Sequence, residues 1–333
     1  MSAVNFWGKM LNVDRRWIFL LIGVVSIVPF LIPVGMPLTT TTEVESIYDC
    51  IDSLGPENAI FLAFDFDPGT DAENMPMSVA VMRHAFFRHV PVFMTAYTPL
   101  GNGMMMSGFE YVTNQELPGC YTPVDYADWA TYRDAGIVDR DGLVAAWEAD
   151  GHSLPENSVG WVFEGRDYAL LGYLPLFHLV ILGMTSSIEA QYPEDSHGNP
   201  LVEMPMLREH KSLREVDLAL TMAGSSACMS WIIYGREKIG LPIAFGVTAV
   251  MATDYFPFIQ SHQIIGQMGG LRGAAEYEVL MERNGVSATT DKAFTGMDVQ
   301  SAAHLLIILL IIMGNVAYFA GGFHKQHLMK SGR

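Results

Sequence analysis

The sequence predicts an α/β fold: a Rossmann-like, mostly parallel sheet with helices on both faces, carried between an N-terminal and a C-terminal transmembrane helix. Three observations predict it. Apolar, strand-like runs alternate with helical segments through the middle of the chain. Uncharged apolar runs of 18 and 22 residues stand near the two ends, at residues 17–34 and 302–323. Nearly all acidic residues lie between those two runs.

The two terminal runs predict membrane spans. As helices that rise about 1.5 Å per residue, both are long enough for a hydrocarbon core of roughly 30 Å. The tails outside them hold 6 of the 19 Lys and Arg but only Asp14 of the 36 acids. The middle therefore has 13 basic and 35 acidic residues, a net charge of −22. Basic flanks stay cytoplasmic, so we expect an inner-membrane protein with both termini cytoplasmic and the main domain extracytoplasmic.

The predicted organisation is a cytoplasmic tail at 1–16, a transmembrane helix at 17–38, an extracytoplasmic α/β domain at 39–300 with an irregular insertion at about 108–165, a transmembrane helix at 301–323, and a cytoplasmic tail at 324–333. No A-x-A-like cleavage site follows the first run, which we interpret as an uncleaved signal anchor. The acidic middle repels nucleic acid, which excludes it as a partner. The expected partners are membrane lipid and either further copies of the chain or other subunits of a membrane complex.

The elements of the middle follow in order. Residues 43–54 predict a short helix, 58–66 a strand buried on both faces, 76–88 a helix, and 90–97 a second strand. Later come a strand and a short element at 168–184, a strand at 216–223, a helix at 227–239, a strand at 241–251, and a long helix at 260–283. An alternative assigns the apolar segments 168–184, 216–234 and 240–259 to further membrane spans, but their prolines and β-branched residues favour a sheet.

Four carboxylates lie within nine residues at the end of the first predicted strand and after it: Asp65, Asp67, Asp71 and Glu73. They fall just past its carboxyl end, where open α/β sheets place ligands. Because Mg²⁺ and Ca²⁺ prefer such oxygen ligands, these residues are candidates for holding either metal. Asp65 and Asp67 are also the candidate catalytic residues. The alternative is an acidic, solvated turn whose carboxylates cap the following helix.

The motif Asp65-Phe66-Asp67 at the end of an apolar strand resembles the first motif of haloacid-dehalogenase-type phosphotransferases. The resemblance covers only this strand, and it implies Asp65 as a nucleophile and Asp67 as an acid/base. That family has Thr or Val two residues after the second Asp, where this chain has Gly69. A later Lys and acidic-pair motif is also missing from the pattern.

The turn Gly224-Ser225-Ser226 follows the strand predicted at 216–223. Backbone N–H groups at such a turn could hold an anion, so these three are candidate anion-binding residues. Ser225 or the nearby Cys228 could also serve as a nucleophile beside a histidine. The alternative is that a serine caps the next helix and Cys228 is buried. Three cysteines leave one disulfide, Cys50–Cys120, as an open alternative to three free thiols.

Small residues recur along the helix predicted at 260–283, namely Gly266, Gly269, Gly270, Gly273 and Ala274. Each glycine costs a helix about 1 kcal/mol relative to alanine, and close approach of another backbone can offset that. These residues are therefore candidates for helix packing or an oligomer interface, with the partner in the same subunit or in another copy. Asn315 in the second transmembrane run is a further candidate, because asparagine hydrogen-bonds between membrane helices.

The sequence contains no complete catalytic set. We therefore expect a membrane-anchored, non-enzymatic structural subunit of an oligomeric membrane complex. Two alternatives stay open. One is a metal-dependent hydrolase or phosphatase that uses Asp65 and Asp67. The other is a ligand-binding or sensing module with an apolar cleft at the carboxyl edge of the sheet.

Overall fold

Six parallel strands form the central sheet of the computed structural model, which describes residues 14–31, 38–286 and 292–330. The strand order is β5-β2-β1-β6-β7-β8. The strands are β1 (Ile60–Asp65), β2 (Val92–Ala96), β5 (Tyr168–Tyr173), β6 (Leu218–Ala223), β7 (Ile243–Val247) and β8 (Gly266–Gly269). The chain winds outward from β1 in one direction and then from β6 in the other, which makes the sheet Rossmann-like. The order reverses between β1 and β6, where Asp65 pairs with Ala223.

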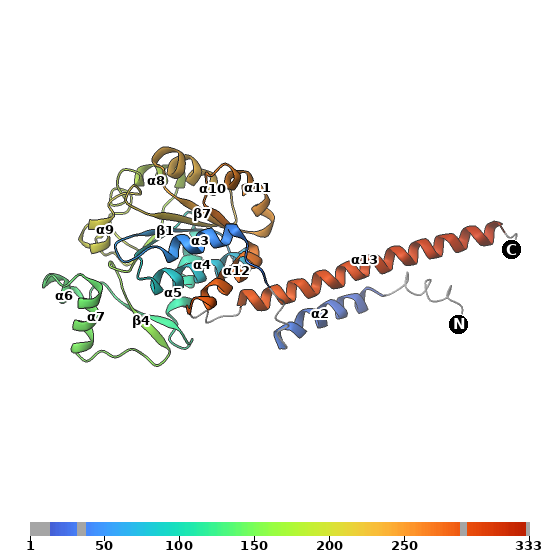
Figure 1. Cartoon of the computed structure of the whole chain (residues 1–333), viewed down its shortest axis with the longest axis horizontal. Coiled ribbons are helices and arrows are strands. Elements are labelled where there is room, and N and C mark those ends of the chain that lie inside the picture. Colours follow the sequence, from blue (N-terminus) through green and yellow to red (C-terminus); the bar gives the residue numbers. More distant parts are fainter. Residues whose placement is uncertain (1–13, 32–37, 287–291, 331–333) are drawn as a thin grey trace. The chain divides into compact units, whose positions relative to one another are not determined.

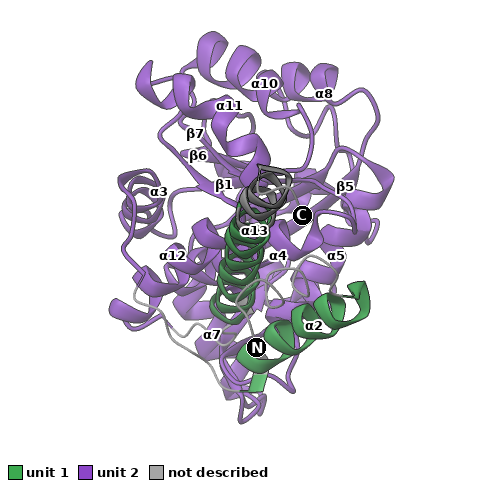
Figure 2. Cartoon of the chain, turned by 90° about the vertical axis from the view of Figure 1, so that its right-hand side faces the viewer, with its two compact units in different colours: residues 1–37, 294–333 green, residues 38–293 purple. Residues whose placement is uncertain are grey.

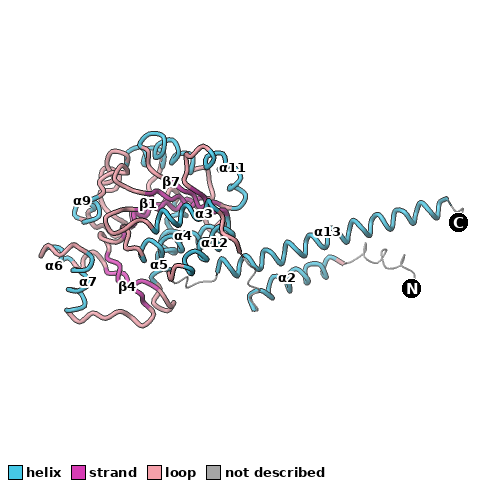
Figure 3. Tube along the Cα trace, in the orientation of Figure 1, coloured by secondary structure: helices cyan, strands magenta, loops and turns pink. Residues whose placement is uncertain are grey.

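Helices cover both faces of this sheet (Figures 1 and 3). One side carries α4 (Asp71–Phe87), α5 (Pro99–Thr113) and α12 (Gly270–Arg283). The other side carries α8 (Phe177–Met184), α10 (Cys228–Ser230), its continuation as the π-helix η2 (Trp231–Glu237), and α11 (Ala249–Gln260). With both faces covered, every residue of β1, β2, β6 and β7 is buried. This explains why those strands appear in the sequence as continuous apolar runs.

The region from 108 to 165, predicted as an irregular insertion, is more ordered than expected. It contains the end of α5 and then β3 (Cys120–Val124), α6 (Ala130–Asp134), α7 (Arg140–Ala149) and β4 (Ser158–Phe163). β3 and β4 pair in parallel as a separate small sheet. Buried aromatic side chains, among them Trp129, Trp161 and Phe163, form its core. The prediction missed these strands because β3 contains Pro123 and neither strand alternates regularly between apolar and polar residues.

The prediction of one long helix at 260–283 was wrong about where the helix begins. Residues Gly266–Gly269 form the edge strand β8, and the helix begins only at Gly270. The strand predicted at 241–251 likewise ends at Val247, and α11 follows it. Gly-Gln-Met-Gly has none of the β-branched residues that mark strands. Gly266 is required by the close approach of α3 and not by helix packing, because a Cβ on Gly266 would lie 2.1 Å from the Glu43 carbonyl oxygen.

The remaining described elements are short or lie near the chain ends. They are α2 (Arg15–Leu31), α3 (Thr42–Asp52), η1 (Leu201–Glu203), α9 (Pro205–Glu209) and α13 (Lys292–Lys330). The chain divides into two compact units, residues 1–37 with 294–333 and residues 38–293 (Figure 2). The second unit contains both sheets, and buried apolar side chains lie on both sides of the large sheet.

One described helix is a candidate membrane span. Within α13, Ala293–Phe319 is long and apolar enough to cross a membrane by length and composition, and only 6% of its most apolar stretch is buried. The span predicted at 301–323 starts inside this range and stays within α13. The N-terminal span predicted at 17–38 stays a prediction, since α2 has 17 residues and residues 32–37 lie outside the described part. The alternative spans at 168–184, 216–234 and 240–259 instead contain β5 with α8, β6 with α10 and η2, and β7 with α11.

Candidate functional site

Asp65 and Ser225 meet at the point where the strand order reverses. Asp65 is the last residue of β1, and Ser225 follows β6. The Ser225 hydroxyl donates a hydrogen bond to the Asp65 carboxylate, and the Gly224 N–H donates to the Asp65 carbonyl oxygen over 2.9 Å. Side chains alternate along β1, and Phe61 and Ala63 belong to the core on the α8–α11 side. Asp65 therefore faces that same side.

The surroundings of Asp65 penalise its charge. Its side chain is 3% exposed, and burial raises the pKa of the carboxyl to about 6, although the Ser225 hydrogen bond lowers it. Two buried hydroxyls, those of Tyr97 just after β2 and of Thr221 on β6, have no hydrogen-bond partner among the described residues. The Asp65 charge also raises the pKa of Tyr97, after the larger effect of burial. The environment of Asp65 thus favours the protonated, uncharged form of its carboxyl.

Two glycines let the loops at this edge approach one another. A Cβ on Gly224 would lie 2.7 Å from the Thr70 hydroxyl, so the loops after β6 and β1 touch there. A Cβ on Gly101 would lie 2.6 Å from the Phe64 carbonyl oxygen, so α5 begins directly against the end of β1. The Thr98 hydroxyl accepts the Gly101 N–H over 2.9 Å and caps that helix. The turn at the end of β1 is thus closely enclosed.

The other predicted carboxylates do not converge on Asp65. Asp67 is exposed, and its Oδ1 accepts the Gly69 N–H over 2.9 Å. Asp71 lies in the first turn of α4. Glu73 Oε2 accepts the Ala249 N–H over 2.8 Å at the start of α11. Among the described residues no three of these four carboxylates gather as a metal-ligand group, so Mg²⁺ or Ca²⁺ binding at this set has no geometric support.

The resemblance to phosphotransferases is not extended by the structure. The loops after β1, β2, β6 and β7 contain no Lys or Arg that could neutralise a phosphoryl group. The predicted anion site at Gly224, Ser225 and Ser226 has the same difficulty, because the Ser225 hydroxyl faces the Asp65 carboxylate. Cys228 is fully buried, and burial raises the pKa of its thiol, so it is a packing residue. Cys50, Cys120 and Cys228 are all free thiols.

The small residues predicted for packing lie inside the unit formed by residues 38–293. Gly266, Gly270, Gly273 and Ala274 are buried, and Gly269 is partly buried. Besides the approach of Gly266 to α3, a Cβ on Gly273 would lie 2.8 Å from the Met268 backbone. The sequence left open whether these residues pack against the same subunit or against another copy. For Gly266 and Gly273 the structure shows a backbone of the same chain. Asn315 is exposed on α13, and its role in helix packing stays a prediction.

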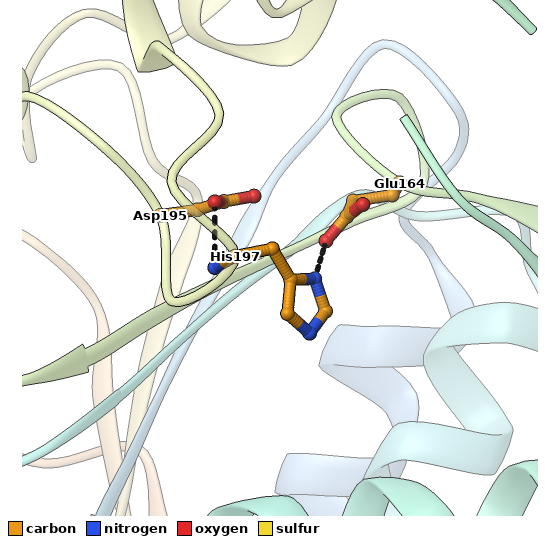
Figure 4. A group of neighbouring side chains, drawn as sticks. All are labelled: Glu164, Asp195 and His197. Carbon is orange, nitrogen blue, oxygen red and sulfur yellow. Dashed lines mark hydrogen bonds and ion pairs between the residues drawn. The ribbon is translucent and has the colours of Figure 1, made fainter. Parts of the chain in front are cut away.

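The structure also brings together Glu164, Asp195 and His197, a group that the sequence analysis missed (Figure 4). Glu164 follows β4 and is 1% exposed. Its Oε1 lies 2.5 Å from His197 Nδ1, and its Oε2 accepts the Tyr126 N–H over 2.9 Å. Asp195 Oδ1 accepts the N–H groups of His197 over 2.9 Å and of Asn199 over 2.8 Å. One ligand atom from each of the three lies within 4.8 Å of the others.

This group ties the turn at residues 195–199 to the junction of β4 and β5. Burial lowers the pKa of His197, but the hydrogen bond and the charge of Glu164 together raise it by more, so the net shift is upward. A protonated His197 then makes a charge-assisted contact with Glu164. Histidine nitrogen and carboxylate oxygens also suit Zn²⁺ or Mn²⁺, which would have to displace that contact. The only sequence signal was the Asp-Ser-His-Gly-Asn turn, which does not indicate a partner 31 residues earlier.

Comparisons of the chain with protein-family models, with curated proteins and with solved structures found no match. The fold and the site therefore define the class only broadly. The chain has a Rossmann-like α/β unit, and α13 is a candidate membrane anchor.

Proposed function

We propose that this protein is a membrane-anchored, non-enzymatic subunit of a homo-oligomeric membrane complex. In this proposal the outer face of α8, α10, η2 and α11 contacts another copy. The supporting observation is a set of large apolar side chains left exposed on that face. They are Leu179, Met229, Ile233, Val250 and Phe256, with exposed fractions of 58, 37, 51, 84 and 44%. Apolar side chains gathered on neighbouring helices are typical of interaction surfaces.

Charge supports a contact between identical faces. The four segments of this face contain only three charged residues, Arg236, Glu237 and Asp254, although the whole chain has a net charge of −17. Protein interfaces are depleted of charge at their centre and enriched in methionine and aromatic residues. Two copies that meet through this face therefore avoid the repulsion that their acidic surfaces would cause elsewhere.

A membrane anchor would strengthen such a contact. If α13 spans the bilayer, all copies are held in one plane with the same orientation, which raises their local concentration. A face of modest affinity is then sufficient for assembly. The hydrolase and ligand-binding alternatives have less support, because the predicted carboxylates do not gather as a group and Asp65 already contacts Ser225.

The test is the mass of the full chain extracted in mild detergent, measured by light scattering. We expect a uniform assembly of several copies. Leu179→Glu and Ile233→Glu place charges on adjacent helices of the proposed face, so each should shift the mass toward that of a monomer. Val202→Glu is the matched control, because Val202 is 52% exposed but lies on η1. A monomeric wild type, or variants that assemble like the control, would contradict the proposal.

A further inference from the structure

A cavity of about 250 Å³ lies between the end of α4 and the small β3–β4 sheet. Three basic side chains contribute to its wall: Arg83, His89 and Arg140. The rest of the wall consists of aromatic and aliphatic side chains and glycines, namely Phe87, Gly119, Tyr121, Val159, Gly160, Gly285 and Val286. Among the described residues, no Asp or Glu lines the cavity. This is unusual in a chain whose acids outnumber its basic residues by 36 to 19. The end of α4 at Phe87 is followed closely by the start of β2 at Val92. The cavity therefore lies toward the amino ends of the parallel strands, at the opposite edge of the sheet from Asp65.

Arg83 is the most informative member of this wall. It is 2% exposed, on a helix whose residues are buried on nearly every side. None of its three guanidinium nitrogens has a hydrogen-bond partner among the described residues. Burial lowers the pKa of Arg83, while Tyr111, Tyr121, Cys120 and Glu278 act in the opposite direction with smaller effects. A buried cation without hydrogen bonds is strongly unfavourable, so a group that accepts from this guanidinium would stabilise the fold.

Arg140 and His89 are held in place beside this position. Arg140 Nη2 donates to the Trp161 carbonyl oxygen over 2.9 Å, and its Nε lies 3.9 Å from Asp167 Oδ1. His89 has a positive φ of 59°, and its Nδ1 donates to the Phe86 carbonyl oxygen over 3.1 Å. Burial lowers the pKa of His89, and the charge of Arg140 lowers it further. The two groups are therefore close enough to feel each other's charge.

The cavity is also small. Pockets for drug-sized ligands usually measure roughly 300–1,000 Å³, so this one suits a smaller molecule. A guanidinium presents its N–H groups in a planar fork that matches a carboxylate or a phosphate. Gly119 and Gly160 leave space on the β3–β4 side, where a Cβ on Gly160 would lie 3.9 Å from Arg140 Nη2.

We propose that this cavity is a binding site for a small oxyanion, a phosphate or carboxylate group, held by Arg83 and Arg140. The ligand accepts hydrogen bonds from the guanidinium of Arg83 and supplies the negative charge that the cavity wall lacks. The neighbouring apolar side chains shield this contact from water, which strengthens it. The site is independent of the assembly face on α8, α10, η2 and α11.

The test uses the full chain in detergent. Its thermal unfolding and its binding heat are followed while chloride is replaced by inorganic phosphate, or by acetate, at constant ionic strength. We expect saturable stabilisation by at least one of these anions, with one site per chain. Arg83→Met keeps an unbranched side chain, although a shorter one, and removes the guanidinium and its charge, so the affinity should fall by roughly ten- to a hundredfold. Arg208→Gln is the control, because Arg208 is exposed and lies outside the cavity.

A second readout protects the test against a folding defect. Without phosphate or acetate, Arg83→Met should be at least as stable as the wild type, because it removes a buried charge whose guanidinium nitrogens have no hydrogen-bond partner among the described residues. If Arg83→Met does not fold, Arg140→Gln provides the same comparison of affinities. Equal stabilisation of the wild type by chloride, phosphate and acetate would overturn the proposal. So would anion binding that survives both substitutions unchanged.

Discussion

Replacing Asp65 with Asn removes a buried charge, and we expect it to stabilise the fold at neutral pH. Burial raises the pKa of Asp65 from 3.8 to about 6, against the lowering effect of the Ser225 hydrogen bond. A shift of about 2 units corresponds to about 3 kcal/mol. Because the folded pKa is the higher one, the folded state holds the proton more tightly than the unfolded chain. The destabilisation is therefore absent below about pH 4 and complete above about pH 6.

The assay is the free energy of unfolding of the full chain by denaturant, at several pH values from about 4 to 8. The difference between Asp65→Asn and the wild type should grow with pH, by about 3 kcal/mol across this range. Ser225→Ala removes a hydrogen bond that lowers the pKa of Asp65, so it should move the midpoint of this change to higher pH. Ser226→Ala, in the same turn and exposed, is the matched control.

One result would refute this reasoning. If the stability difference between Asp65→Asn and the wild type does not grow with pH, the charged form of Asp65 must be stabilised by a partner. A cation would then be the first candidate. Added Mg²⁺ or Ca²⁺ should in that case stabilise the wild type and leave Asp65→Asn unchanged.

Two further predictions concern packing and a buried histidine. Gly266→Ala should destabilise the fold by about 1–3 kcal/mol or more, because its Cβ would lie 2.1 Å from the Glu43 carbonyl oxygen. Gly103→Ala, on α5 with nothing within 4 Å of its Cβ, should be stabilising by about 0.5–1 kcal/mol, and thermal melts compare the two. His84 is fully buried, its Nδ1 lies 2.7 Å from the Tyr277 hydroxyl oxygen, and burial lowers its pKa to about 4. The wild type should therefore lose stability as the pH falls from 6.5 to about 4, and His84→Gln should remove that loss. Denaturant titrations near pH 4 and pH 7 measure that loss.

The fold was predictable where burial leaves a direct trace in the sequence. The strands β1, β2, β6 and β7 are buried on both faces, so each appears as an apolar run of sufficient length. Strand β8 left no such trace. It has four residues, two of them glycines, and Gly266 is required by the approach of α3, an element more than 200 positions earlier in the chain. A contact of that kind has no local signature.

The sites show the same division. Asp65 and Ser225 could each be placed at the carboxyl end of a strand, but their contact depends on β1 and β6 being neighbours. That adjacency follows from the topology and not from either segment. Arg83 was not recognised because an arginine on a predicted helix is ordinarily solvated. The available signal was that apolar residues surround it on the helix, which leaves α4 without a polar face.

Asp65 and His84 should have opposite effects on stability over nearly the same pH range. The pKa of His84 falls from 6.5 to about 4, so its contribution to stability is lost as the pH falls through this range. The pKa of Asp65 rises to about 6, so its contribution is lost as the pH rises. Each effect is about 3 kcal/mol, and the two nearly cancel in the wild type.

A flat wild-type profile would therefore conceal two steep ones. The stability of Asp65→Asn should increase with pH, that of His84→Gln should decrease with pH, and the double variant should again be nearly flat. The two residues contact different partners, Ser225 and Tyr277, so their effects should add. If both single variants show the flat profile of the wild type, neither group titrates differently in the folded and unfolded chain. If the effect of the double variant differs from the sum of the two single effects, Asp65 and His84 are coupled across the sheet through β1 and α4.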